Sequence, residues 1–301
     1  MNAVILARSP EKHRKSLTSR QHRRTLLLVR LDSGSHIMAA PSSIASTCRT
    51  RGAHCHEIKQ TFVNTAASNG RHARCYLRAR RQGALSTLSQ RIVGYPYGSV
   101  VPFVLDQQAR PIILVSRLAE HTRNLQADAR ASLLVRDDGD DVQAGARLTL
   151  LGDAARIECD PALKDRFLRY QPRSRQLLDL GDFSFLRITP VTLRYIAGFG
   201  TIRWVSASEY APPANELAHD EPRIVAQTNA GESDSLRICC SQSLRRGVIQ
   251  ALMLGVDCDG FDVVANGVNL RYDFPEPATD SESVRRAVAE TLKIGRDTPT
   301  P

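Results

Sequence analysis

Residues 83–135 decide the fold, and their sequence is GALSTLSQRIVGYPYGSVVPFVLDQQARPIILVSRLAEHTRNLQADARASLLV. Short apolar runs, several of them rich in β-branched residues, occupy positions 84–88, 99–105, 111–116 and 132–135. Each run is bounded by Gly, Pro, Asp or Gln, so each is predicted to be a strand. A helical pattern over 118–127 separates the third run from the fourth, because Leu118, Thr122 and Leu125 recur at helical spacing. This order of elements predicts a small meandering barrel.

Polar side chains gather where the third predicted strand turns into this helix. They are Ser116, Arg117, Glu120, His121, Arg123 and Asn124. A helix N-terminus carries free backbone N–H groups and a partial positive charge, so hydroxyl, imidazole and guanidinium groups beside it suit a phosphate or a carboxylate. We therefore expect the ligand-binding centre here. The alternative is that Ser116 only caps the helix and His121 is a surface residue, since serine at such a junction is commonly an N-cap.

Four separated segments then bring a family into view: GYPYGSVVPF (94–103), SRLAEHTRNL (116–125), RLTLLGDAARI (147–157) and YIAGFGTIRW (195–204). In this order they resemble the haem-utilisation (HugZ-type) proteins of the FMN-binding split-barrel superfamily, which includes pyridoxamine 5'-phosphate oxidase. The resemblance covers residues 74–210 and continues more weakly to 294. It implies an α+β protein, with a split β-barrel, flanking helices and a small C-terminal α+β domain.

The resemblance also implies FMN as the cofactor of a flavin-dependent oxidoreductase. The residues that it places at the flavin phosphate or at the same turn are Ser116, Arg117, His121, Thr122 and Asn124. Pyridoxamine phosphate oxidases carry Ser-Arg-Lys where this chain has Ala119, Glu120 and His121. A neutral histidine donates one hydrogen bond where lysine brings a permanent charge, so phosphate affinity is expected to fall.

Aromatic residues add a second part to the expected site. Tyr97, in the run Tyr-Pro-Tyr-Gly before a strand, is placed to wall a planar ligand, or else belongs to an ordinary turn. Trp204, the only tryptophan, follows Arg203 on the last barrel strand. By resemblance that strand faces the cofactor slot of a partner subunit, which implies a homodimer. An ordinary core or interface tryptophan is the alternative.

Haem is the alternative ligand that the resemblance implies. HugZ-type proteins bind haem in a cleft between subunits and open its ring, with a histidine on the iron. Many carry that histidine before the proline at Pro172, where this chain has Gln171. The C-terminal domain often contains a His-Met-Asn-x-Asp-His run, which here is residues 227–232 with both histidines replaced. His121 is the single histidine within 82–218. A third hypothesis is a non-enzymatic tetrapyrrole-binding regulator, as in plastid relatives of this fold.

Charge distribution argues against nucleic acid as a partner. Residues 1–82 hold 16 Lys and Arg against three acids, whereas the rest holds 25 against 28. A nucleic-acid footprint needs its basic residues on the folded face. The sequence also offers no metal site, because the His-Cys-His run at 54–56 lies on an unpatterned segment and no zinc pairing of cysteines occurs. We expect no catalytic nucleophile of the Ser–His–Asp type either.

Three regions are predicted along the 301 residues. Residues 1–70 are expected to form a disordered basic extension, 71–210 the split barrel, and 211–296 the C-terminal domain. Arginine-rich, acid-poor composition is also typical of a transit peptide. The one apolar run of the extension, 25–29, is too short to span a membrane. Seven cysteines without paired spacing are expected to be reduced, mostly buried thiols of a cytoplasmic protein.

The remaining elements follow from periodicity, Pro and Gly. Helices are predicted over 72–81, 161–170, a piece ending at 180, 221–229, 234–243 and 281–294. Strands are predicted over 146–158, 183–188, 191–197, 201–206, 249–256, 261–265 and 268–272. Pro190 is expected to separate two of these strands. The Asn-Gly pair at 266–267 predicts a hairpin turn.

Overall fold

The computed structural model describes residues 69–139, 141–158, 160–198 and 202–297. The predicted extension, 1–70, lies outside the described residues except for its last two. Asn69 and Gly70 belong to the first helix, α1, which spans Asn69–Arg78. A Cβ atom at Gly70 would overlap the backbone oxygen of Glu209, so only glycine allows this helix to approach α5 so closely. The first helix therefore begins three residues before its predicted start at residue 72.

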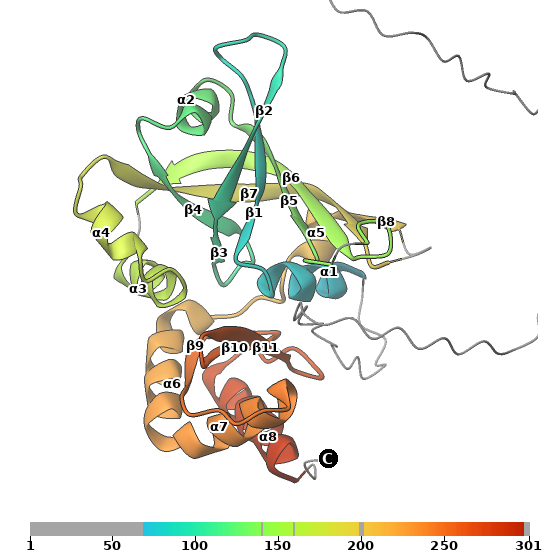
Figure 1. Cartoon of the computed structure of the whole chain (residues 1–301), viewed down its shortest axis with the longest axis vertical. Coiled ribbons are helices and arrows are strands. Elements are labelled where there is room, and N and C mark those ends of the chain that lie inside the picture. The colour runs from blue at the N-terminus through green and yellow to red at the C-terminus, as the bar shows by residue number, and fades with distance from the viewer. Residues whose placement is uncertain (1–68, 140, 159, 199–201, 298–301) are drawn as a thin grey trace, which may run out of the picture. The chain divides into compact units, whose positions relative to one another are not determined.

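Eight antiparallel strands build the barrel sheet. They are β1 Gln82–Leu88, β2 Pro96–Pro102, β3 Val104–Leu105, β4 Pro111–Ser116, β5 Arg130–Arg136, β6 Arg147–Ile157, β7 Phe183–Ile196 and β8 Ile202–Ser206. Their order is β2-β1-β5-β6-β7-β4-β3, and β8 pairs with β7. Figure 1 shows the sheet curling on itself. The predicted α+β split barrel with flanking helices is confirmed.

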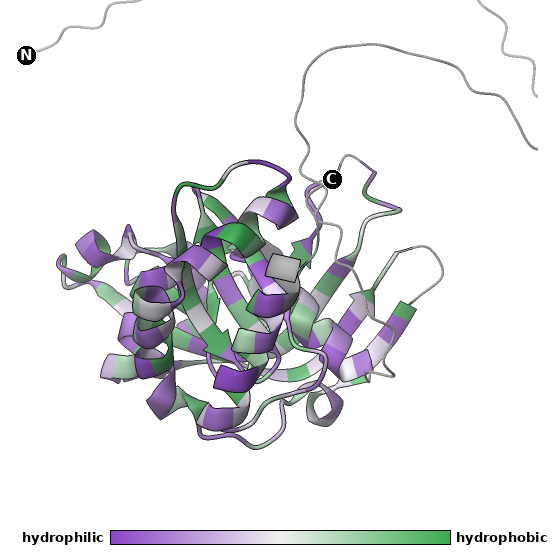
Figure 2. Cartoon of the chain, turned by 90° about the horizontal axis from the view of Figure 1, so that it is seen from below, coloured by the Kyte–Doolittle hydropathy of each residue, from purple (hydrophilic) through white to green (hydrophobic). Residues whose placement is uncertain are grey.

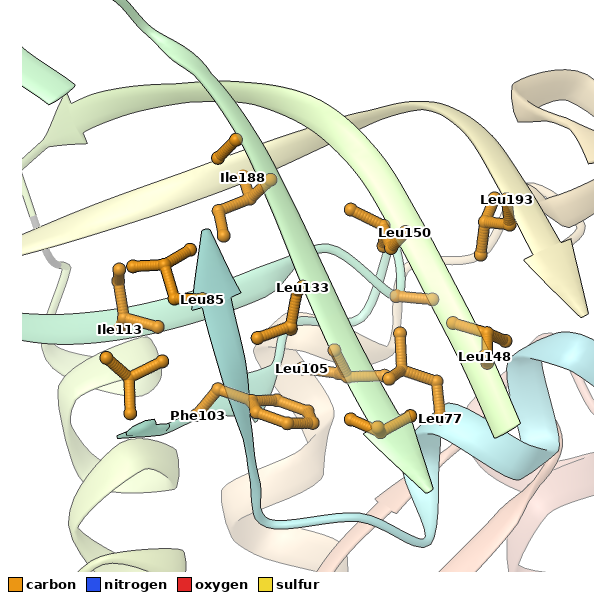
Figure 3. Packing of buried hydrophobic residues seen from close by; sticks show 14 of the residues in the cluster. Leu77, Leu85, Phe103, Leu105, Ile113, Leu133, Leu148, Leu150, Ile188 and Leu193 are labelled. Carbon is orange, nitrogen blue, oxygen red and sulfur yellow. The ribbon is translucent and has the colours of Figure 1, made fainter. Parts of the chain in front are cut away.

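Alternation along the strands fills the barrel with aliphatic side chains. In β1 and β5, Leu85 and Leu133 point inward and are fully buried, as is Leu148 of β6. Figure 3 shows these side chains meeting in the space that the strands enclose. Leu77 of α1 joins the same cluster, so this helix packs on the barrel core. The helices beside the barrel are α2 Glu120–Ala127, α3 Pro161–Tyr170, α4 Ser174–Leu178 and α5 Ala207–Tyr210.

The predicted break at Pro190 is wrong, because β7 runs without interruption through this residue. The pairing between β6 and β7 shifts between Leu151 and Gly152, and Pro190 lies opposite Gly152. The residue that this bulge leaves without a partner is Val191, and Pro190, which has no N–H to donate, is accommodated directly beside the bulge. A Cβ atom at position 152 would overlap the backbone of Thr189. The glycine therefore belongs to the same irregularity.

The C-terminal part is α+β, as predicted. Its elements are α6 Leu217–Gly231, α7 Ser233–Leu244, β9 Ala251–Asp257, β10 Gly260–Ala265, β11 Val268–Asp273 and α8 Ser281–Asp297. The sheet order is β11-β10-β9, and Asn266 and Gly267 form the hairpin turn with φ of 47° and 79°. In Figure 2 hydrophilic and hydrophobic residues alternate along the helices, as expected where one side packs on a core. This part has an apolar cluster of its own.

Buried charges join helix α1 to this C-terminal sheet. Arg74 donates from Nε and Nη2 to the two carboxylate oxygens of Asp259, at 2.6 and 2.9 Å. Asp257 lies 3.2 Å from a guanidinium nitrogen of Arg78 and accepts from Arg271 at 2.9 and 3.0 Å. Burial opposes the ionisation of Asp257, but Arg271 and Arg78 outweigh it and lower its pKa.

Helix α3 meets the C-terminal part through the same kind of contact. Arg166 pairs with Glu221 of α6 at 2.5 Å, and Tyr170 donates to Asp262 of β10 at 2.6 Å. Arg81 pairs with the other oxygen of Asp262 at 2.7 Å. We call these contacts, together with those of α1, the charged junction. The sequence did not predict it, and the independence of the 211–296 domain stays a prediction.

Candidate functional site

The turn between β4 and α2 is held by side-chain hydrogen bonds. Ser116 Oγ donates to Asp182 Oδ2 at 2.7 Å and accepts from the backbone N–H of Leu118 at 3.1 Å. Thr122 Oγ1 donates to the backbone oxygen of Ser116 at 2.7 Å. The N-cap of α2 is Ala119, which has no side chain to cap with. Ser116 therefore shapes the turn before the helix and is not its N-cap.

Asn124 is fully buried and ties α2 to strand β1 and the loop that follows it. Its Nδ2 donates to Thr87 Oγ1 at 2.9 Å, and its Oδ1 accepts from the backbone N–H of Gln90 at 2.9 Å. The amide thus has intrachain partners on both its nitrogen and its oxygen. In this arrangement Thr122 and Asn124 position α2.

His121 lies on the side of α2 that faces β2. It is half-buried, and its Nδ1 lies 3.2 Å from Ser99 Oγ. In the tautomer in which Nδ1–H donates to Ser99, Nε2 keeps its lone pair, which is the arrangement of a metal-binding histidine. Burial lowers the pKa of His121 below its ordinary value. The ring is therefore neutral at pH 7 and able to act as a ligand.

Charges around this turn nearly cancel. Arg117 is exposed, and Arg123 pairs with Glu120 at 3.6 Å. Asp182 brings a negative charge to Ser116. A phosphate needs several free donors or a net positive charge. Because Ser116, Thr122 and Asn124 are engaged within the chain, the side chains of this turn do not fit a phosphate well.

Tyr97 belongs to this group, whereas Arg203 and Trp204 do not. Tyr97 pairs with Thr87 across β1 and β2, on the strand that also carries Ser99. Trp204 lies on β8, which pairs with β7 and is separated from β2 by the four strands β1, β5, β6 and β7. Residues that lie opposite each other on neighbouring strands form a row across the sheet: Val100, Ala84, Leu134, Thr149, Arg194 and Trp204. With about 4.8 Å between neighbouring strands, Trp204 lies about 24 Å from Val100 along the sheet.

The outer face of this sheet is apolar at many positions. Strands β2, β5, β6 and β8 carry exposed large apolar side chains on the face that includes Val100 and Trp204, namely Val100, Leu134, Leu151, Ile202 and Trp204. Trp204 is 61% exposed, and the guanidinium of Arg194 lies 5.1 Å from its ring centroid. In the row given above, Thr149 and Arg194 lie between Leu134 and Trp204, so the exposed apolar positions of this face are interspersed with polar ones.

The residues singled out for haem lie away from α2. Gln171 donates from Nε2 to the backbone oxygen of Arg81 at 3.3 Å, next to the charged junction. Figure 1 shows α3, which ends just before it, at the opposite end of the barrel from α2. In the 227–232 run, Asn229 bonds the backbone of Met253 in both directions, at 2.8 and 3.0 Å. This asparagine therefore pairs with β9, an outer strand of the small sheet.

Asp257, Cys258 and Asp259 lie close enough together to suggest a metal site, since one ligand atom of each is within 4.8 Å of the others. Both carboxylates are already paired with arginines. Burial raises the pKa of the Cys258 thiol to about 12, which disfavours the thiolate that a metal needs. The cluster belongs to the charged junction. The His-Cys-His run at 54–56 lies outside the described residues.

The sequence missed two residues that complete the site. Ser99 orients His121, and the alternation of β2 was a usable signal for it, because Ser99 and Tyr97 are two residues apart and share a face. Asp182 holds Ser116 from a loop 66 positions away, and no local pattern indicates it. The four described cysteines, Cys75, Cys239, Cys240 and Cys258, are buried and free, as predicted. No helix of the described chain is long and apolar enough to cross a membrane.

Comparison with known proteins decides the family. The chain is 34% identical over 226 residues to the chloroplastic heme oxygenase HOZ of Arabidopsis thaliana, which covers 71% of this chain and 70% of that protein. The chain belongs to the haem-utilisation (HugZ-type) family of split-barrel proteins. The heme oxygenase HutZ of Vibrio cholerae is 29% identical over 124 residues, 38% of this chain and 70% of that protein.

Two further matches agree with the split-barrel fold. The family model described as CREG, beta-barrel, matches residues 64–212. A solved structure of a protein of unknown function from Agrobacterium tumefaciens superimposes with a TM-score of 0.62 at 25% identity, over 73% of this chain and 94% of that one. The latter match extends well beyond the length of the barrel, so the neighbour shares part of the C-terminal region as well.

Proposed function

We propose that this protein binds haem and opens its ring oxidatively, as an oxidoreductase of the heme oxygenase class. Haem is then its substrate, and supplies the iron at which dioxygen is reduced. Two relatives carry the name heme oxygenase, and one of them is 34% identical to this chain. The observation that carries the proposal for this chain is the position of His121, which is half-buried on α2 with its Nδ1 3.2 Å from Ser99 Oγ.

His121 would bind the haem iron through Nε2. A histidine that ligates a metal usually donates its other ring N–H to an oxygen acceptor, which fixes the tautomer and the ring orientation. Ser99 Oγ stands at hydrogen-bond distance from Nδ1 for this role. Gln171 has an amide, a poor iron ligand beside imidazole. The loss of a histidine at 171 is therefore offset in this chain by a histidine at 121.

FMN, the first expectation from the sequence, fits this site less well. The hydroxyls and the amide expected at its phosphate are bonded within the chain, and Asp182 adds a negative charge beside Ser116. Haem has no phosphate and presents two carboxylates on one edge. Exposed Arg117 is suited to pair with one of them, because guanidinium–carboxylate pairs are strong and geometrically specific.

A homodimer would bring the two groups of predicted residues together. Within one chain Trp204 and Arg203 lie about 24 Å along the sheet from the β2 end, and both β2 and β8 expose large apolar side chains, Val100 and Trp204 among them. In a two-fold dimer the same face is used twice. We infer that Tyr97 of one subunit and the partner's Trp204 flank the flat macrocycle, with the partner's Arg203 at a propionate.

The compartment remains a prediction. The sequence favoured a cytoplasmic protein, and the name of the Arabidopsis relative describes that protein as chloroplastic. The basic composition of residues 1–70 is compatible with either, and these residues lie outside the described chain except for the last two. Neither nucleic acid nor a membrane is proposed as a partner.

Haem titration of the purified protein tests the proposal. We expect a Soret band typical of histidine ligation, and a linear tetrapyrrole after addition of a reductant and dioxygen. His121→Ala should weaken haem binding about 100-fold and Ser99→Ala about 10-fold. His219→Ala, an exposed histidine on α6, is the matched control and should bind as the wild type does. Absence of haem binding by the wild type would refute the proposal. Histidine-ligated haem without turnover would favour a non-enzymatic regulator.

A further inference from the structure

A cavity lies between helices α6 and α8 of the C-terminal part, outside the site on the barrel. Its volume is about 220 Å³. The residues that line it on one side are Ile224, Gln227, Thr228, Gly231 and Glu232, and those on the other side are Arg285, Val288 and Ala289. Most of them recur three or four positions apart, so each helix turns one face toward the cavity.

Small residues leave this cavity open. Ser281 Oγ donates to Asp220 Oδ2, which joins the first turns of α8 and α6. Further along α6, Gly231 has no side chain, and a Cβ atom built on it would meet nothing within 4 Å. On α8 the small side chain of Ala289 borders the same space. The two helices are therefore held together at their starts and leave room beyond them.

The floor of the cavity is apolar except for one hydroxyl. Ile224 is 1% exposed and Val288 is 4% exposed. Thr228 is 8% exposed, and its hydroxyl has no hydrogen-bond partner within the described chain. Buried polar groups are normally hydrogen-bonded. The hydroxyl of Thr228 therefore requires a partner that enters the cavity.

Two opposite charges stand at the rim, and no ion pair joins them. Arg285 is exposed and donates from Nε to the backbone oxygen of Ser281 at 3.1 Å, but it pairs with no acid among the described residues. Glu232 accepts from Ser235 Oγ at 2.7 Å and has no basic partner in the same part of the chain. A guanidinium suits a carboxylate, and a carboxylate suits an ammonium group. The rim thus presents complementary groups for both ends of a zwitterion.

We propose that this cavity binds a small zwitterionic amino acid with an aliphatic side chain. The aliphatic group covers Ile224 and Val288, and the ammonium group donates to Glu232. The carboxylate pairs with Arg285 and accepts from the hydroxyl of Thr228. The volume suits a molecule of this size, since pockets for drug-sized ligands begin at about 300 Å³. This second site is independent of haem.

The rim charges disfavour simpler ligands. A carboxylic acid without an amino group would bring a second negative charge to Glu232, and an amine without a carboxylate would bring a second positive charge to Arg285. Gln227 and Glu232 stand at the two ends of the 227–232 run, where the family resemblance implies histidines. An amide oxygen and a carboxylate accept hydrogen bonds from an ammonium group, whereas a single carboxylate is a poor basis for a metal site.

Three ligands of matched shape test the proposal. The full-length protein without haem is titrated by calorimetry with L-leucine, with 4-methylpentanoate, which lacks the ammonium group, and with 3-methylbutylamine, which lacks the carboxylate. We expect L-leucine to bind about 10-fold or more tightly than either analogue, because each analogue loses one charge-assisted contact. Equal binding of all three compounds, or no binding of L-leucine at about 10 mM, would overturn the proposal.

Substitutions then locate the site. Arg285→Gln and Glu232→Gln each remove one charge and should weaken L-leucine binding about 10-fold. Arg286→Gln is the matched control, because Arg286 is the exposed neighbour on α8 and does not line the cavity. It should bind L-leucine as the wild type does. Ala289→Phe should fill the cavity and abolish binding.

Thr228→Val removes the hydroxyl with little change of shape. It should weaken L-leucine binding several-fold and leave the melting temperature of the unliganded protein unchanged or higher, since no partner within the chain is lost. If Ala289→Phe fails to fold, as judged by circular dichroism, the charge variants decide. Equal losses in Arg285→Gln and Arg286→Gln, or undiminished binding by a folded Ala289→Phe protein, would contradict the assignment. Haem titrations of Arg285→Gln should match the wild type, so the two sites are tested separately.

Discussion

The charged junction and the α2 end of the barrel are both rich in polar side chains, and they differ in how these are satisfied. At the junction, Asp257 and Asp259 are fully buried, and each carboxylate meets two or more arginines. At the α2 end, His121 is half-buried and one ring nitrogen is outside its hydrogen bond to Ser99. In the first arrangement the carboxylates are paired within the chain, whereas in the second a lone pair on Nε2 is left for a ligand when Nδ1–H donates to Ser99.

Whether a polar side chain is fully paired within the chain distinguishes structural residues from candidate binding residues better than residue type does. Buried ion pairs are expensive to desolvate, and breaking one partner costs more than the intact pair contributes. Such groups are therefore retained where they fix one packing geometry. Polar groups that the chain leaves incompletely satisfied in a half-buried position are candidates for binding. The two regions consequently predict opposite responses to substitution.

The largest effect is expected at the junction. Asp257→Asn leaves Arg78 and Arg271 buried without their shared carboxylate, and should lower the free energy of unfolding by about 3–5 kcal/mol. Urea unfolding followed by circular dichroism measures it. Asp234→Asn is the control, because Asp234 is exposed and pairs with Arg237 at 3.2 Å, and should cost less than about 1 kcal/mol. Equal losses would mean that the junction is solvated and contributes little.

The lowered pKa of Asp257 gives this effect a pH dependence. A carboxyl group whose pKa is lower in the folded state contributes stability above its unfolded pKa, and that stability is lost as the pH falls through the folded value. The wild type should therefore lose stability below about pH 4 more steeply than Asp257→Asn does. Parallel acid-unfolding curves for the two proteins would contradict the assignment.

An intermediate effect is expected at Asn124, which supports the site without belonging to it. Asn124→Ala leaves the hydroxyl of Thr87 and the N–H of Gln90 without partners, so it should cost about 1–3 kcal/mol of unfolding free energy. Hydrogen exchange should become faster in the loop between β1 and β2 and in α2 together. Gln126→Ala, at an exposed position of the same helix, is the control. Faster exchange confined to α2 would show that this loop is held by other contacts.

The sequence was sufficient for most elements of the fold, because alternation, Pro and Gly determine them locally. It failed at Pro190, where a bulge that depends on the neighbouring strand accommodates the proline. It also failed at the junction. Arg71, Arg74 and Arg78 were counted with the basic excess of residues 1–82, yet their spacing places them on one face of α1, against the acids near β9. Arginines on one face of a helix do not predict buried ion pairs until the acidic partners are known.

The candidate site was predictable only where its residues are consecutive. Ser116, His121 and Asn124 are close in sequence, so their clustering followed from one strand and one helix. The different roles of these three residues did not follow from the local sequence, because their partners Thr87, Ser99 and Asp182 reach them through strand register and a distant loop. The separation of Trp204 from this cluster likewise depends on the order of strands in the sheet.

The smallest effect on stability, and a large one on binding, is expected at His121. Burial lowers the pKa of His121 in the folded protein, so the neutral ring is favoured there. The contribution of this neutral ring to the free energy of unfolding is fully present above the pKa of the unfolded state, about 6.5, and is lost as the pH falls below it. A proton and the iron would compete for Nε2, so haem affinity should be constant between about pH 8 and 6.5. It should fall in more acidic solution. Soret titrations at each pH measure this, with His121→Ala, whose weak binding should not follow the same curve, as the control. Affinity that already declines between pH 8 and 7 would require a raised pKa at the ligand, and would place the iron on a group other than His121.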